Sequence, residues 1–222
     1  MQAIILAAGQ GQRLRPHTLT CPKPLLQCGP HRLIEYHLYR LAAAGCHEAI
    51  ITTSYRSQDF KAYLKDESHY GLKLTFSREP PPCFETGGGI IRALQYLDDA
   101  PFCVISGDLY TTYPFEPLMK QHPTWGHLCL VPAQTPQADF DLQSGLIQSP
   151  GPYWYGNIGV FHPRCFNDWP LCRIPLGRIL RQLSAQRRLT GSIIESTWHN
   201  VSTPQQWTQL HDQLKTLPTL AL

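Results

Sequence analysis

The stretch from Ile4 to Leu26 constrains the fold of this 222-residue chain more than any other. It reads I-I-L-A-A-G-Q-G-Q-R-L-R-P-H-T-L-T-C-P-K-P-L-L, so a short apolar run is followed by two glycines and then by cations. That order predicts a buried strand that leads into a phosphate-binding loop. Gly9 and Gly11 let main-chain N–H groups approach an anion, and Arg13 offers planar guanidinium donors to phosphate oxygens. An ordinary strand-to-turn transition with surface arginines is the alternative that the glycines alone leave open.

The rest of the chain alternates between the hydrophobic spacings of helices and strands. Helical spacing occurs at 31–44, 57–65, 90–97, 114–121, 175–185 and 204–216, with Thr86 as the expected cap of the third helix. Strand patterns occur at 48–53, 72–76, 102–105, 126–132, 138–142, 145–148, 153–161 and 193–201. This alternation predicts an α/β fold, namely a Rossmann-like, mixed and mostly parallel sheet with helices on both faces.

An aspartate follows one of these strands at the place where such sheets bind ligands. The site of a parallel sheet lies at the carboxyl ends of its strands, and the 102–105 strand leads into Ser106-Gly107-Asp108. Facing a phosphate loop, Asp108 is a natural oxygen ligand for Mg²⁺. A turn aspartate after a glycine explains the same dipeptide equally well, so the motif alone leaves both explanations open.

Composition excludes several classes of function. The net charge of +3 is too small to imply a nucleic-acid partner or an anionic membrane. No apolar run approaches transmembrane length, and the start M-Q-A-I-I-L lacks the basic region of a secretory signal, so we expect no membrane partner and a cytoplasmic location. The eight cysteines form no C-x-x-C pair and are expected to be reduced and structural.

Two common nucleotide-binding motifs do not fit the opening loop. The dinucleotide fingerprint G-x-G-x-x-G requires a glycine at the position of Leu14. The P-loop requires G-K-[ST], whereas Lys23 is followed by Pro24. A dehydrogenase and a P-loop ATPase are therefore both disfavoured.

The complete string is more specific than its glycines. L-A-A-G-x-G-x-R-L-x-P-x-T followed by P-K-P-L resembles the signature of the sugar-nucleotide pyrophosphorylases, the nucleotidyltransferases that join a nucleoside triphosphate to a sugar 1-phosphate. The resemblance continues in family order through Leu33-Ile34-Glu35-Tyr36, Glu85-Thr86-Gly87-Gly88-Gly89, Gly107-Asp108 and Asn157-Ile158-Gly159-Val160. It implies a GT-A-like nucleotidyltransferase fold in one domain, 1–222, with a nucleotide-binding half at 1–112 and a sugar-phosphate-binding half at 113–222.

The resemblance also implies roles for individual residues. Nucleotide contacts fall on the end of the first strand and on the loop, at Leu6, Ala7, Ala8, Gly9, Gly11 and Arg13. Lys23 would neutralise phosphate charge and, with Arg13 and Asp108, make up the catalytic set. Thr86 and Gly87 would close over the base, and Glu79 could accept a hydrogen bond from the uracil N3–H.

Two residues of the second half are matched to the sugar. Asn157 falls where family members hydrogen-bond the sugar, and the alternative is an amide satisfied inside a strand. Asp139 could contact the sugar or the helix of a neighbour.

One departure from the family pattern concerns the metal. The family usually ends its catalytic half with D-V-G-T, whose aspartate is the second Mg²⁺ carboxylate, whereas this chain has Asn200-Val201-Ser202-Thr203. An amide oxygen ligates a hard cation without supplying negative charge, so the expected Mg²⁺ site of Asp108 and Asn200 should be weaker. An active enzyme with a weaker metal site and a catalytically impaired nucleotide-binding relative both remain open.

The implied reaction needs little acid–base chemistry. A sugar-phosphate oxygen attacks the α-phosphorus of the nucleotide in line, and a phosphomonoester is already an anion near neutral pH. The expected partners are a nucleoside triphosphate and a sugar 1-phosphate, in a monomer or a small homo-oligomer. Within this family, the short chain and the E-T-G-G-G-I string resemble members that use UTP and N-acetylmuramate 1-phosphate, and this resemblance implies these substrates, with GTP or CTP and another sugar phosphate as alternatives.

Overall fold

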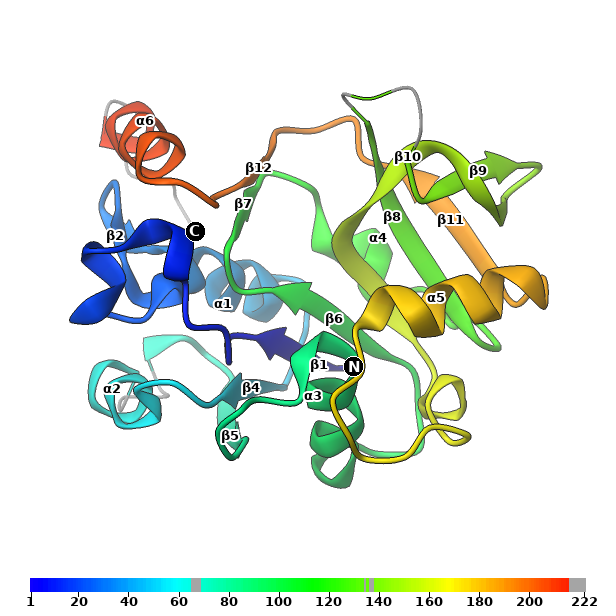
Figure 1. The fold of residues 1–222 in the computed structure, drawn as a ribbon, viewed down its shortest axis with the longest axis horizontal. Helices are drawn as coiled ribbons and strands as arrows, with labels where there is room; N and C mark the ends of the chain where they lie inside the picture. The colour runs from blue at the N-terminus through cyan, green and yellow to red at the C-terminus, as the bar shows by residue number, and fades with distance from the viewer. Residues whose placement is uncertain (65–68, 134, 136–137, 216–222) are drawn as a thin grey trace.

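A mixed eight-stranded sheet forms the centre of the computed structural model, which describes residues 1–64, 69–133, 135 and 138–215 (Figure 1). Its strands follow the order β11-β8-β10-β6-β1-β4-β5, and β9 pairs with β10. Their bounds are β1 Gln2–Leu6, β4 Glu48–Thr53, β5 Lys73–Arg78, β6 Phe102–Ser106, β8 Gly126–Pro132, β9 Phe140–Gln143, β10 Leu146–Phe161 and β11 Leu189–Ile193. The predicted fold class is confirmed.

The two sides of the sheet differ in strand direction. On one side β6, β1, β4 and β5 are parallel, with Ile5 of β1 in register with Ile105 and Ile51 of its neighbours. On the other side β10 runs antiparallel to both β6 and β8, while β11 runs parallel to β8. The carboxyl ends of β1 and β6 therefore lie together, where the phosphate loop and Asp108 follow them.

Helices cover both faces of the sheet, and each face has its own apolar core. One face packs against α1 (Leu33–Ala43), α2 (Ser57–Tyr63) and α4 (Phe115–Met119). The other face packs against α3 (Glu85–Ala93) and α5 (Leu176–Ala185). Burial of these apolar side chains supplies the main stabilisation of the layered arrangement.

A third apolar cluster joins the C-terminal helix to the opening loop. Helix α6 (Pro204–Lys215) packs on the small hairpin of β2 (Gln27–Cys28) and β3 (His31–Arg32). Leu210 and Leu214 of this helix lie in one cluster with Leu14 of the loop. No helix among the described residues is long and apolar enough to cross a bilayer.

Three predicted elements differ from the structure. The two strands expected at 145–148 and 153–161 form one strand, β10, with register shifts where the ladder is irregular. The single strand expected at 193–201 is wrong, because β11 ends at Ile193 and a separate strand, β12 (Trp198–Asn200), pairs with β7 (Leu109–Thr111) in a small sheet of its own. Polar residues between Ile194 and Trp198 follow the point where the chain leaves the main sheet.

The helix expected to begin after Thr86 starts two residues earlier, with Phe84 at the cap position. Glu85 is its first residue, and the Thr86 hydroxyl accepts a hydrogen bond from the Leu176 N–H at 2.9 Å, so Thr86 joins two helices instead of capping one. Lys65 and Thr216, the last residues of two predicted helices, lie outside the described residues.

Candidate active site

The loop after β1 is fixed by its own backbone geometry. Gly11 has φ +61, and a Cβ there would stand 2.8 Å from the Thr18 Cγ2 atom. The Gly11 carbonyl accepts hydrogen bonds from the Thr18 hydroxyl at 2.8 Å and from the Leu14 N–H at 2.9 Å. A Cβ on Gly9 would meet nothing within 4 Å, so this glycine faces open space. The loop is therefore pinned at Gly11 and open at Gly9.

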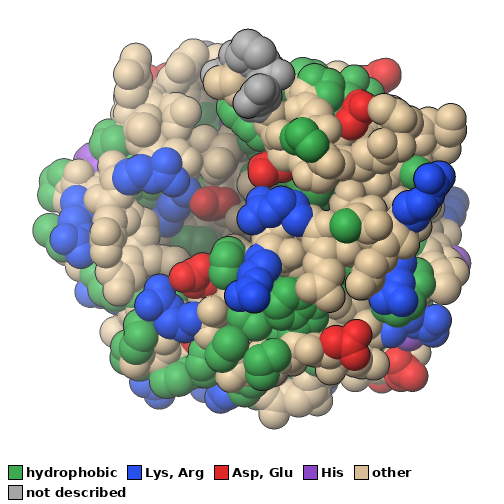
Figure 2. Space-filling model, turned by 45° about the vertical axis from the view of Figure 1, so that its right-hand side comes forward, with side chains coloured by type: hydrophobic (Ala, Val, Ile, Leu, Met, Phe, Trp, Pro, Cys, Tyr) green, Lys and Arg blue, Asp and Glu red, His purple; other side chains and the backbone are tan. Residues whose placement is uncertain are grey.

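This loop forms one wall of a cavity of about 470 Å³, which we call the main cavity. Figure 2 shows the face on which the molecule is hollowed between basic and acidic side chains. The predicted nucleotide-binding and catalytic residues that line the main cavity are Leu6, Ala7, Gly9, Gly11, Arg13, Lys23 and Asp108. Residues far apart in sequence thus meet around one space.

Asp108 is held at the edge of the main cavity by two side chains. Its Oδ2 accepts from the Lys23 ammonium at 2.6 Å, and its Oδ1 accepts from the Ser106 hydroxyl at 2.8 Å. The Gly107 N–H donates to the Leu6 carbonyl at 2.9 Å, which ties the end of β6 to the end of β1. The Lys23 side chain is only 9% exposed and that of Asp108 31%, so water screens this pair less than it would screen a surface pair.

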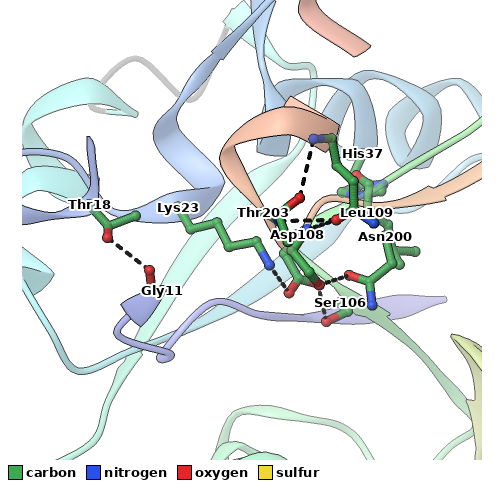
Figure 3. Close-up of polar contacts among 11 residues, drawn as sticks. Gly11, Thr18, Lys23, His37, Ser106, Asp108, Leu109, Asn200 and Thr203 are labelled. Carbon is green, nitrogen blue, oxygen red and sulfur yellow. Dashed lines mark hydrogen bonds and ion pairs between the residues drawn. The ribbon is translucent and has the colours of Figure 1, made fainter. Parts of the chain in front are cut away.

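Asn200 reaches Asp108 through backbone pairing. It stands opposite Leu109 in the β7–β12 ladder, and the Val201 N–H donates to the Asp108 carbonyl at 3.0 Å. Figure 3 shows Lys23, Ser106 and Asn200 gathered around Asp108. The Asn200 amide oxygen accepts a 3.3 Å hydrogen bond from the Ser202 hydroxyl.

The donor set around Asp108 suits a cation that arrives with its own ligands. Within the described ranges no group of three His, Cys, Asp or Glu side chains is arranged to hold a metal ion. Asp108 and Asn200 supply one carboxylate and one amide oxygen. The Lys23 ammonium is already paired with the Asp108 carboxylate. Mg²⁺ in nucleotide enzymes commonly takes one or two carboxylates and completes its shell with phosphates and water, so these residues fit Mg²⁺.

A smaller pocket of about 170 Å³, the inner pocket, adjoins the main cavity and shares Leu6, Gly9 and Asp108 with it. Three predicted nucleotide-binding residues, Ala8, Glu79 and Thr86, line the inner pocket.

Glu79 is only 2% exposed, and one carboxylate oxygen accepts from the Phe84 N–H at 2.7 Å. Burial raises the pKa of Glu79, although the Phe84 N–H and the nearby Arg92 oppose that shift. Glu79 is thus a buried acceptor on the wall of the inner pocket.

Gly87 is placed differently from Thr86. Its N–H donates to the Ile174 carbonyl at 2.9 Å, and a Cβ on Gly87 would stand 2.7 Å from that oxygen. The structure therefore uses Gly87 to bring α3 close to the segment before α5. Its predicted contact with the base remains a prediction.

A third space, the side pocket, has a volume of about 180 Å³ and brings together Asn157, Asp139 and Thr86. The register of β10 against β8 shifts between Tyr155 and Ile158, and Asn157 has φ 58 at this bulge. Such bulges re-aim side chains, and a non-glycine residue at positive φ carries a conformational cost. Contact of Asp139 with the sugar or with the helix of a neighbour remains a prediction, and in the structure Asp139 pairs with Arg181 of α5 at 3.3 Å.

The sequence patterns did not identify Arg173 or His37 as residues of this region. Arg173 and Ser202 line the main cavity, and Arg173 pairs with Glu85 at 3.1 Å. Arg173 lies in a segment without a motif, so a cation two residues before Pro175 was the one available signal.

His37 appeared in the sequence only as one position of a helical pattern. It is buried, and its Nε2–H donates to the Leu109 carbonyl at 3.0 Å. Its Nδ1 has no partner among the described residues. Burial lowers the pKa of His37 to about 4, so the ring is neutral at pH 7 and supports the residue next to Asp108.

Comparisons with known proteins agree with this geometry. A family model described as nucleotidyl transferase matches residues 2–140. N-acetylmuramate alpha-1-phosphate uridylyltransferase of Neisseria meningitidis is 34% identical over 217 residues, which cover 91% of this chain and 94% of that protein. Mannose-1-phosphate guanyltransferase of Neurospora crassa is 40% identical over 129 residues, 57% of this chain and 35% of that protein. The solved inositol-1-phosphate CTP transferase of T. maritima has the same fold, with a TM-score of 0.80 at 16% identity, over 97% of this chain and 96% of that one.

Proposed function

Because the chain belongs to the nucleotidyl transferase family, we propose that it transfers a uridylyl group from UTP to N-acetylmuramate 1-phosphate and releases pyrophosphate. The family supports the coarser statement that the chain is a sugar-1-phosphate nucleotidyltransferase. The choice of UTP and of this acceptor is the proposal, in which the reaction serves cytoplasmic recycling of cell-wall sugars. It is motivated by the similarity to the uridylyltransferase, which extends over nearly the whole chain.

The observation that carries the proposal is the Lys23–Asp108 pair beside the glycine loop, with 2.6 Å between ammonium and carboxylate. In nucleotidyl transfer an oxygen of the acceptor phosphate bonds to the α-phosphorus. The bond from that phosphorus to the bridging oxygen breaks, and pyrophosphate leaves with the electron pair. The protein supplies positioning and positive charge. Arg13 and Lys23 line the main cavity, as does Arg173, and we assign the neutralisation of phosphate charge to Arg13 and Lys23.

The position of Glu79 favours a nucleotide whose base carries a ring N–H donor. Its buried carboxylate on the inner pocket would accept from the N3–H of uracil or the N1–H of guanine. Cytosine N3 carries no proton and offers a lone pair instead, which faces a carboxylate unfavourably. GTP with mannose 1-phosphate is therefore the main alternative, and it is favoured by the 40% identity to the guanyltransferase.

Mg²⁺ would be held by Asp108, with Asn200 as a neutral second ligand. When bound, the ion would neutralise charge on the nucleotide phosphates. Replacing Asn200 with aspartate restores the usual pair of carboxylates, so we expect Asn200→Asp to lower the Mg²⁺ concentration for half-maximal rate by roughly tenfold. A rate that appears only in this variant would instead identify the native chain as a catalytically impaired nucleotide-binding relative.

Pyrophosphate release with a panel of substrates tests the proposal. UTP, GTP and CTP are each paired with N-acetylmuramate 1-phosphate and with mannose 1-phosphate, and Asp108→Ala serves as the control for background. We expect the UTP and N-acetylmuramate 1-phosphate pair to have the highest kcat/KM. A higher value for GTP with mannose 1-phosphate would replace the proposed specificity, and no turnover above Asp108→Ala with any pair would reject the proposed activity.

A further inference from the structure

Arg181 lies at the rim of the side pocket. Its Nη1 is 3.3 Å from Oδ1 of Asp139, which lines that pocket. The same nitrogen is 3.4 Å from the place where a Cβ on Gly177 would stand, and Gly177 also lines the pocket. Figure 1 shows α5, which carries Arg181, lying against β10. The helix therefore holds a guanidinium group against Asp139 and Gly177, two residues of the pocket that also contains Asn157, the residue matched to the sugar.

The hydrogen bond to Asp139 uses only a small part of the guanidinium group. Arg181 has five N–H donors, and within the described part of the chain Asp139 is its one hydrogen-bond partner. Their side chains are 53% and 49% exposed, so solvent screens the pair and its contribution to stability is small. A ligand carboxylate could accept two parallel hydrogen bonds from the forked N–H groups of the guanidinium. Such a bidentate contact would be stronger than the single hydrogen bond to Asp139.

The surroundings of Arg181 also have space for a substituent. Arg181 lines a neighbouring groove of about 370 Å³ together with Arg187, Gln148 and Ser149. The described lining of this groove includes two arginines and no acidic side chain. A substituent of the sugar that extends past Arg181 would therefore enter an open groove whose positive charge favours an anion.

We propose that Arg181 determines acceptor specificity by binding a carboxylate carried on the hexose, so that the acceptor class is an acidic sugar 1-phosphate. The inference rests on the proposed function, and it assigns to Arg181 a contact outside the phosphate-transfer machinery. N-acetylmuramate 1-phosphate carries such a carboxylate on its lactyl ether. N-acetylglucosamine 1-phosphate has the same ring without that group, and it offers nothing that matches the fork of an arginine.

The two acceptors provide the test, with UTP and Mg²⁺ at saturation. For the native chain we expect kcat/KM to be at least tenfold higher with N-acetylmuramate 1-phosphate than with N-acetylglucosamine 1-phosphate. Arg181→Gln should raise KM for the acidic acceptor by roughly tenfold to a hundredfold and remove most of that preference. Arg181→Lys should restore part of the preference, because lysine keeps the charge and loses the bidentate geometry.

Arg178→Gln is the matched control. Arg178 lies on the same helix, is exposed, and stacks over Trp169 with 5.5 Å between its guanidinium carbon and the ring centroid. The substitution removes the same charge from α5, but Arg178, unlike Arg181, lines no part of the neighbouring groove and makes no hydrogen bond to Asp139 among the described residues, so the acceptor preference should be unchanged.

The possible failures can be told apart. An Arg181→Gln enzyme that keeps the native preference, or an Arg178→Gln enzyme that loses it to the same extent, would overturn the role of Arg181. A native chain that uses both acceptors equally would overturn the acidic acceptor class and leave uridylyl transfer standing. A native chain that uses neither acceptor would reject the proposed function itself.

Discussion

The nucleotide loop and the side pocket are built in different ways. The loop, from Gly9 to Lys23, is one short segment whose shape is set by Gly11 and Thr18 and whose lysine is already paired with Asp108. The side pocket is assembled from Thr86, Asp139 and Asn157, which lie on three separate parts of the chain. The Arg181–Asp139 ion pair beside this pocket has a longer nitrogen–oxygen distance than the Lys23–Asp108 pair, and its side chains are more exposed.

This difference assigns phosphate binding to the loop and the choice of acceptor to the side pocket. A contiguous and prearranged loop suits the part of the reaction that all family members share, namely binding and neutralising phosphates. A pocket assembled from distant segments varies without disturbing that loop, and it therefore suits the choice of acceptor. Substitutions in the loop should affect every substrate pair alike, whereas those at the side pocket should change the ratio between acceptors.

Lys23→Ala should produce the largest effect, because it removes the cation from the loop and leaves Asp108 without its 2.6 Å partner. We expect kcat/KM to fall by about a hundredfold to a thousandfold, the range found when one preorganised charge contact is removed. The fall should be equal for acidic and neutral acceptors in a pyrophosphate-release assay. Lys120→Ala, which breaks an exposed ion pair with Glu116, is the control and should keep full activity.

A loss restricted to one acceptor in Lys23→Ala would contradict the division between loop and side pocket. It would mean that the loop lysine also contributes to recognition of the sugar.

His37→Gln tests whether the support behind Asp108 is structural. The pKa of His37 is about 4 in the folded protein and near 6.5 when unfolded, so between these values the unfolded chain binds more protons. Stability from this residue is therefore complete above about pH 6.5 and is lost as pH falls toward 4, by about 3 kcal/mol in all. Glutamine keeps a donor for the Leu109 carbonyl and does not titrate.

Denaturant unfolding from pH 7 to pH 4 measures this effect. We expect the unfolding free energy of the native chain to fall relative to that of His37→Gln as the solution is acidified. His122→Gln, at an exposed position, should parallel the native chain. Parallel curves for His37→Gln and the native chain would show that the buried ring does not resist protonation.

The two loop glycines should separate stability from ligand binding. An alanine at Gly11 meets Thr18 at 2.8 Å and must adopt φ near +61, so Gly11→Ala should lower the unfolding free energy by about 1–2 kcal/mol. An alanine at Gly9 meets nothing, so Gly9→Ala should leave the unliganded protein unchanged in stability. It should nevertheless weaken UTP binding measured by calorimetry, because the added methyl projects where the backbone faces the main cavity.

Equal stability losses for Gly9→Ala and Gly11→Ala would remove the distinction between a pinned and an open position. Unchanged UTP affinity in Gly9→Ala would place the phosphates away from this part of the loop.

The sequence could predict the loop because its information is local. Gly9, Gly11 and Arg13 lie within five residues, and the strand before them is continuous in its apolar pattern. The sequence could also predict Asp108 as a site residue, because ligands generally bind at the carboxyl ends of parallel strands. The fold class followed from the same alternation of helix and strand spacing.

The side pocket could not be predicted in the same way. Arg181 meets Asp139 only because α5 packs on the sheet, and no pattern in the chain encodes which face of that helix meets which strand. The strand expected at 193–201 failed for a related reason, because a β-rich pattern does not say that β11 and β12 belong to different sheets. Tertiary packing decided both outcomes.

Transfer of label from UTP tests the proposed activity most directly. UTP labelled at the α-phosphate is mixed with Mg²⁺, N-acetylmuramate 1-phosphate and either the native chain or Asp108→Ala, and the products are separated. We predict that the native chain places the label in the UDP-sugar and releases one unlabelled pyrophosphate for each label transferred, while Asp108→Ala transfers at least a hundredfold less. UTP bound by the native chain with no label transferred to the sugar, at any Mg²⁺ concentration, would contradict the proposal.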